Sequence, residues 1–277
     1  MDGEVAQLAA LVISANHRLS NPADPMEWFA DQRAFASCGR IGFRAAERRR
    51  FGKPRHVPVA QTPTDWLDLL AGSQVDRVVM SCTRQDQNHD PKDTLPDRVA
   101  AGFAGGGSLW RMSTETQDGG ALCWQPGWAA AFPTAKDGRI WATDYMAEPC
   151  VGGDIGPSVA SAITNLHAAL SRAEAFATQH LFTQVAAIFA SALCVLDGDP
   201  DPRPVPRPPG PADTLTPPAR RLLNAAQRGW IFDNMGLWKD QDFSPDVWKS
   251  YATISEALYT AVTAAITAAV NSSISND

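Results

Sequence analysis

The chain has 277 residues, 44% of them hydrophobic, which is enough to bury a core without support from disulfides or metals. The formal net charge of −6 excludes a protein whose whole surface is committed to nucleic acid or acidic membrane, because such binding depends on basic side chains that neutralise phosphates. The N-terminal residues have no basic segment before an unbroken apolar run, so we expect no signal peptide and a soluble, cytoplasmic protein.

Helix signals mark the start of the chain and several later positions. Apolar residues at steps of three and four predict an amphipathic helix over residues 4–19. A capping residue followed by proline favours a helix that begins at the proline. This pair occurs at Asp24-Pro25, Thr62-Pro63, Thr216-Pro217 and Ser244-Pro245.

Two further helical patterns lie in the second half of the chain. The helical period from 157 to 196 predicts either one kinked helix or two stacked helices, with a stop at Gly198. The other pattern belongs to the last helix, which is expected to begin at Pro245 and contains the apolar stretch 261–270. This stretch is shorter than the roughly 20 residues that span a bilayer. We therefore expect no membrane-spanning segment.

Between about residues 75 and 146 the hydrophobic period changes to two, which predicts strands at 76–84, 108–116, 121–126 and 139–146. The turn sequences at Asp118-Gly119 and Asp137-Gly138 favour tight hairpins between the last three strands. The sequence therefore predicts an α+β fold, with a small antiparallel meander sheet packed against several helices and a mostly helical C-terminal third.

A proline-rich stretch divides the chain. Prolines lack the backbone N–H that helices and sheets need, so this stretch predicts an extended connector. We expect an α+β domain over 1–198, the connector over 199–216, and a helical segment over 217–277 that packs back on the domain.

The cysteines Cys38, Cys82, Cys123, Cys150 and Cys194 are odd in number and form no C-x-x-C pair. This pattern favours reduced thiols in a cytosolic protein over disulfides or a zinc site. No nucleotide-binding loop or metal-ligand spacing occurs either, so we expect no cofactor and no metal.

One candidate catalytic group follows the first predicted strand. Cys82, Arg84, His89 and Asp90 bring a thiol, a guanidinium, an imidazole and a carboxylate to one polar stretch. A thiolate nucleophile would need a base such as His89 and an orienting carboxylate. The alternative, favoured by the frequency of such loops, is a solvated loop without chemistry.

A second candidate group lies on the last strand and its neighbours. Asp144 and Glu148 would supply carboxylates, and the candidate ligand-binding rings are Trp110, Trp124, Trp141 and Tyr145. Aromatic walls with carboxylates suit a sugar, a base or a cation. The alternative is cross-strand aromatic packing under covering helices.

A basic run extends from Arg40 to His56 and could dock an acidic partner, a phosphate-bearing ligand or RNA. It contains few aromatic residues, so it does not favour nucleic acid, and a solvated helix face is the favoured interpretation.

Two functional hypotheses remain, and the sequence does not decide whether the protein is an enzyme. The first is a binding or assembly protein that contacts a protein partner, a second copy of itself or a small-molecule ligand. The alternative is a cofactor-independent enzyme, a hydrolase or transferase, with its site at the strand ends.

Overall fold

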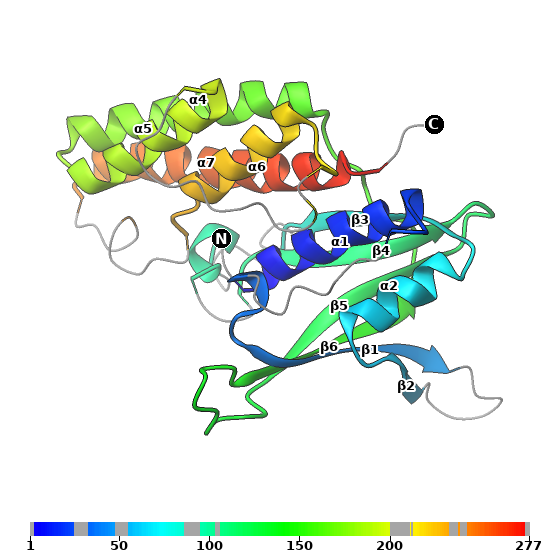
Figure 1. Ribbon diagram of the computed structural model, residues 1–277. Helices are drawn as coiled ribbons and strands as arrows, with labels where there is room; N and C mark the ends of the chain where they lie inside the picture. Colours follow the sequence, from blue (N-terminus) through cyan, green and yellow to red (C-terminus); the bar gives the residue numbers. More distant parts are fainter. Residues whose placement is uncertain are drawn as a thin grey trace.

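A six-stranded mixed sheet forms the centre of the molecule, as the computed structural model in Figure 1 shows. The structure describes residues 3–24, 33–47, 55–85, 95–102, 106–199, 211, 213–232, 238 and 243–274. The strands are β1 (Cys38–Glu47), β2 (Arg55–Ala60), β3 (Val75–Thr83), β4 (Leu109–Thr116), β5 (Ala121–Ala129) and β6 (Trp141–Pro149). Their order is β2-β1-β6-β5-β4-β3, and only β1 and β6 pair in parallel.

The predicted α+β fold is confirmed, but the purely antiparallel sheet is wrong. The four expected strands are present as β3 to β6, and they pair antiparallel in sequence order. The basic run lies on β1 and β2 where it is described, and not on a helix. Because β1 pairs with β6 from far along the chain, it adds a parallel contact that a meander of sequential strands does not contain.

In the described residues, seven α-helices accompany the sheet. They are α1 (Glu4–Ser20), α2 (Pro63–Ala71), α3 (Asp97–Ala100), α4 (Val159–Gln179), α5 (Thr183–Asp197), α6 (Pro217–Gly229) and α7 (Pro245–Asn271), with a short 3₁₀ helix at Arg33–Phe35.

A capping residue followed by proline correctly predicts where three of these helices begin, namely α2, α6 and α7. The Thr62 hydroxyl accepts a hydrogen bond from the Asp65 N–H, and the Asp65 carboxylate accepts one from the Thr62 N–H, which forms a capping box for α2. The Thr216 hydroxyl caps α6, and α7 begins at Pro245. The start predicted at Pro25 lies outside the described residues.

The long helical pattern forms two helices, α4 and α5. The break lies at Leu181, whose φ of 62° is rare for a residue with a side chain. Gly198 ends α5 in the left-handed conformation, with a φ of 84°. Most of the proline-rich connector lies outside the described residues, and the α6 and α7 helices after it pack against α4 and α5.

Helices cover the sheet on one face and at one edge (Figure 1). α1 contacts β3 and β4, while α2 contacts β1 and β2, so these two helices cover what we call the core face. α4 to α7 form a helical layer beside the edge strand β3, which α7 contacts directly. The opposite, open face carries polar side chains such as the exposed Gln125 and Glu148.

The last helix begins at Pro245, as predicted, and extends to Asn271, so it is longer than the apolar stretch 261–270 within it. By length and composition alone, α7 could cross a membrane, since it has 27 residues and a mean hydropathy of 1.3 over an 18-residue window. Within the fold, 67% of that window is buried. This is the environment of a core helix, which passes the same test of length and composition.

A disulfide joins Cys123 of β5 to Cys150, which directly follows β6. The expectation of reduced thiols is therefore wrong for these two residues. Antiparallel pairing places Cys123 opposite Glu148. Cys150 follows Glu148 by only two positions, and its sulfur is therefore close enough to bond with that of Cys123. The cysteine pattern consequently no longer supports a cytosolic location.

Two buried asparagines cover part of the free edge of β3. The Asn16 amide accepts a hydrogen bond from the Val78 N–H (2.8 Å) and donates one to the Val78 carbonyl (2.9 Å). Asn271 makes the same pair of bonds with Met80, at 2.8 and 2.9 Å. Each side chain thus replaces one residue of a neighbouring strand.

Candidate functional site

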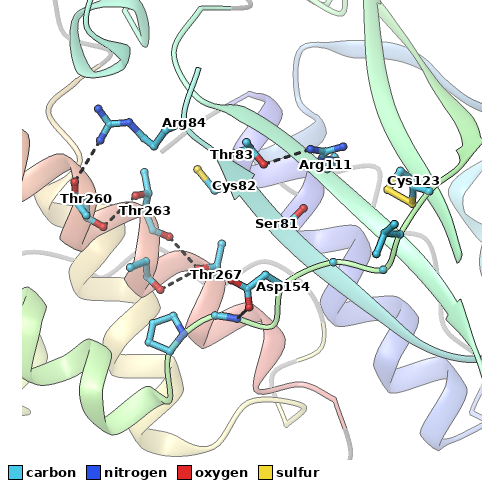
Figure 2. A pocket seen from close by; sticks show the side chains of 17 residues that line it. Ser81, Cys82, Thr83, Arg84, Arg111, Cys123, Asp154, Thr260, Thr263 and Thr267 are labelled. Carbon is cyan, nitrogen blue, oxygen red and sulfur yellow. Dashed lines mark hydrogen bonds between the residues drawn. A yellow bond between two sulfur atoms is a disulfide. The ribbon is translucent and has the colours of Figure 1, made fainter. Parts of the chain in front are cut away.

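A cleft of about 740 Å³ lies between β3, α7 and the segment 150–157, which we call the crossing segment (Figure 2). β3 contributes residues 81–83, Arg84 directly follows this strand, and β4 contributes Arg111. The disulfide and most of the crossing segment form a second wall, and the small residues Thr260, Thr263, Ala264 and Thr267 of α7 form a third.

The crossing segment is tied to the open face of the sheet. The Gly153 N–H donates to the Glu115 carboxylate (2.7 Å) and to the Ser113 hydroxyl (3.1 Å). A Cβ atom on Gly152 would lie 2.7 Å from Glu115 Oε1, and one on Gly153 would lie 2.8 Å from Ser113 Oγ. A side chain at either position would therefore displace the Glu115 or Ser113 side chain, so glycine favours the close approach that builds this wall.

Arg111 brings a cation to this cleft that forms no ion pair with the residues that the structure describes. Its side chain is half-buried and faces the cleft from β4. Nη2 donates a hydrogen bond of 3.3 Å to the Thr83 hydroxyl, which Figure 2 shows beside it. Across the described ranges, no carboxylate pairs with this guanidinium.

Arg84, by contrast, belongs to a buried ionic network at the end of β3. Asp97 is 2% exposed, and its carboxylate accepts hydrogen bonds from Arg84 Nε (3.2 Å), the Gln85 N–H (2.8 Å) and the Ser108 hydroxyl (2.8 Å). The Arg84 guanidinium also pairs with Glu256 of α7. Arg84, which directly follows β3, therefore links this strand to α3 and α7 and has a structural role.

Cys82 lines the cleft, with its sulfur directed toward α7 in Figure 2. Burial raises the pKa of its thiol to about 12, and the negative charge of Asp97 adds to this effect. The Ser108 hydroxyl and Arg84 lower the pKa by smaller amounts. The thiol is thus protonated at neutral pH, whereas a cysteine nucleophile reacts as the thiolate. The proposed base His89 and its companion Asp90 lie outside the described residues.

Asp144 and Glu148 do not join this group. Both lie on β6, two strands beyond β4, in the strand order of the sheet. Asp144 forms a two-pronged ion pair with Arg40 of β1, at 2.9 Å for each bond. Glu148 lies 3.6 Å from the His56 imidazole of β2. The carboxylates therefore sit on the open face, away from the cleft.

The aromatic candidates also separate from the cleft. Trp110, Trp124 and Tyr145 are at most 4% exposed and point to the core face. Phe43 stacks on Tyr145 with ring centroids 5.2 Å apart, as expected for cross-strand packing. The half-buried Trp141 packs edge-to-face on Trp128, at a centroid distance of 6.3 Å.

Sequence reasoning missed the cleft residue Arg111 and the network residue Asp97. Arg111 alternates with Trp110, so the strand pattern already placed it on the face opposite the buried ring. No local signal marks Asp97, because its partners Arg84 and Ser108 come from other elements.

Glu4 is a half-buried carboxyl in the first turn of α1. Burial raises its pKa from 4.5 to about 7, and the nearby Trp128 indole lowers it by a smaller amount. In the unfolded chain the carboxyl ionises near its ordinary value. Between pH 4.5 and 7, the folded state therefore holds a proton that the unfolded state has released. The free energy of unfolding consequently falls as pH rises through that window.

Glu4→Gln is expected to raise the free energy of unfolding at pH 8 by about 2 kcal/mol, with little effect at pH 4. The favourable position of a carboxylate at a helix N-terminus, worth about 0.3–1 kcal/mol, keeps the gain below the full pKa difference. Urea unfolding of both proteins from pH 4 to 8 measures this, with Glu47→Gln as the control for the loss of one charge. A difference that does not grow with pH would contradict the prediction.

Within the described ranges, no three His, Cys, Asp or Glu side chains cluster as metal ligands would. Comparison with protein-family models, curated proteins and solved structures gave no match to this chain. The geometry of the cleft is therefore the basis for the function proposed below.

Proposed function

We propose that this protein binds a small anionic ligand in the cleft between β3, α7 and the crossing segment. The observation that carries the proposal is Arg111, a half-buried guanidinium that faces the cleft and has no carboxylate partner among the described residues. A guanidinium presents N–H donors in a planar fork, which matches the oxygens of a carboxylate or a phosphate.

The size of the cleft and the hydroxyls beside Arg111 support the same function, while Asp154 is the one carboxylate among the described lining residues and accepts a hydrogen bond from the Gly156 N–H. Its volume of about 740 Å³ lies within the range of small-molecule sites, roughly 300–1,000 Å³. The Ser81 and Thr83 hydroxyls line it beside Arg111 and can donate or accept further hydrogen bonds. The N-terminal end of α4, which begins at Val159 shortly after the cleft residue Pro157, adds a partial positive charge nearby.

Catalysis has less support than binding. Burial holds the Cys82 thiol in its protonated form, and Arg84 is committed to Asp97 and Glu256. The carboxylates Asp144 and Glu148 lie on another part of the sheet. The chemistry offered by the described part of the cleft is therefore recognition of an anion.

Arg111→Gln is expected to weaken anion binding at least tenfold, because it removes the charge while keeping some hydrogen-bonding capacity. A panel of monocarboxylates, dicarboxylates and inorganic phosphate is screened for thermal stabilisation, and the hits are titrated by calorimetry. Arg139→Gln, in the hairpin between β5 and β6, is the matched control because it removes the same charge outside the cleft.

Binding by the wild type and the Arg139 variant, with loss in the Arg111 variant, would support the proposal. Equal affinity in all three proteins would refute it. So would the failure of every anion to bind at millimolar concentration.

A further inference from the structure

The outer edge of β3 changes its partner along the strand. The N–H and C=O groups of Val78 and Met80 point away from β4 and are paired with Asn16 and Asn271. Hydrogen-bonding direction alternates along a strand, so the N–H and C=O of Cys82 point to the same outer edge. In the described part of the chain, neither group has a hydrogen-bond partner.

The helix α7 runs alongside this edge and leaves a space opposite Cys82. It contacts β3 at Met80 through Asn271, and it contacts Arg84, which directly follows β3, through the Thr260 hydroxyl, which accepts a hydrogen bond of 3.3 Å. An extended chain rises about 13 Å between Met80 and Arg84. The helix rises about 16 Å between Thr260 and Asn271, so the two elements lie side by side in opposite directions.

Between those contacts, α7 presents small residues to the cleft. The Thr263 and Thr267 hydroxyls donate to carbonyls of their own helix, to Tyr259 and Thr263 respectively. These donors are therefore already used, and the helix supplies no side chain that reaches Cys82 as Asn271 reaches Met80. Figure 2 shows this threonine wall facing the end of β3.

We infer that the ligand of the cleft carries a carboxamide group, which pairs with the outward N–H and C=O of Cys82 as Asn16 and Asn271 pair with the preceding positions. This inference rests on the proposed function, because the anionic end of the same ligand would bind Arg111. A carboxamide holds one acceptor and one donor on the same side, which is what a single edge residue needs. The ligand class is a short-chain acid with a terminal carboxamide.

Hydrogen exchange tests, without any ligand, whether the Cys82 N–H lacks a hydrogen-bond partner within the protein. The Cys82 N–H is expected to exchange at least about tenfold faster than those of Val78 and Met80, because only the latter two are bonded to asparagine side chains. Amide exchange resolved residue by residue by NMR measures this. Protection of Cys82 equal to that of Met80 would overturn the inference, since the edge would already be occupied.

Two probes of equal charge then test the ligand class. Glutaramate carries a carboxamide and a carboxylate, and monomethyl glutarate replaces the carboxamide with an ester that has no N–H donor. Glutaramate is expected to bind about fivefold more tightly, which corresponds to one net hydrogen bond. It is also expected to slow exchange of the Cys82 N–H, and unchanged exchange in the complex would overturn the inference.

The variants Cys82→Ala and Cys82→Pro form a matched pair, since both remove the thiol and only proline removes the N–H. Proline is tolerated at an edge strand where the N–H points outward. The alanine variant is expected to keep the preference for glutaramate and the proline variant to lose it. If the proline variant does not fold, the exchange experiment on the wild type decides.

The possible failures are distinguishable. Equal binding of the two probes, abolished for both by Arg111→Gln, would overturn the carboxamide inference and leave the proposed anion site intact. Binding of both probes that survives Arg111→Gln would overturn the proposed function itself.

Discussion

Asn271→Leu is expected to lower the free energy of unfolding by about 3–5 kcal/mol. Leucine has a similar size but cannot accept from the Met80 N–H or donate to the Met80 carbonyl and the Ile155 carbonyl, 3.0 Å away. Three backbone groups would lose their partner, and a buried polar group without a partner costs about 1–3 kcal/mol. Asn271 is only 3% exposed, so little water can replace the amide.

Urea unfolding measures the loss, with Asn165→Leu on the exposed side of α4 as the control for an asparagine exchanged in a helix. Asn16→Leu is expected to have an effect of about 3 kcal/mol, since it pairs with both edge groups of Val78 and donates to the Ser273 hydroxyl. A loss below about 1 kcal/mol for Asn271→Leu would show that the edge of β3 is not sealed by this side chain.

Local sequence signals predict the ends of the helices well, because the interactions that start and end a helix involve residues close together in the sequence. The capping box at Thr62 involves Asp65, three residues later, and the stop at Gly198 needs only a residue that accepts a positive φ. The choice between one kinked helix and two helices could not be made in this way. Leu181 adopts the left-handed conformation without being glycine, so no residue type marked the break.

The spacing of the basic residues explains why β1 was missed. Arg40 and Arg44 are four positions apart, which places them on one face of a helix. A step of four also returns to the same face of a strand, because side chains alternate with a period of two. The spacing therefore fits both structures. The partner that makes this segment a strand is β6, which lies far along the chain and leaves no trace in the local pattern.

Strand alternation is enough to divide the second candidate group between the two faces of the sheet. Asp144 and Tyr145 are neighbours on one strand, so their side chains point to opposite faces and cannot line the same side of a sheet. The structure places Tyr145 in the core and Asp144 on the open face. Strand alternation cannot predict the pairing of Asn16 and Asn271 with the edge of β3, because each asparagine forms hydrogen bonds with a strand that is distant in sequence.

The disulfide was missed for a related reason. Counting and spacing cysteines tests for local motifs, whereas the Cys123–Cys150 bond depends on the register between β5 and β6. That register is fixed by which strand faces meet the core. The bond also forms part of the cleft wall, so an architectural feature invisible in the sequence contributes directly to the candidate site.

Asp97→Asn is expected to lower the free energy of unfolding by about 3 kcal/mol or more, because it removes the buried charge that pairs with Arg84 Nε and leaves Glu256 as the carboxylate beside this guanidinium. The Asp97 and Arg84 side chains are 3% and 17% exposed, so water compensates little. Asp76→Asn, at an exposed position of β3, is the control in urea unfolding. The double variant Asp97→Leu/Arg84→Met should recover part of the loss, since an apolar pair requires no desolvation of charge. Recovery would show that the network stabilises the fold through the balance of its charges. The double variant also removes the ion pair between Arg84 and Glu256, so a larger loss of stability would show that this pair is the main interaction of Arg84.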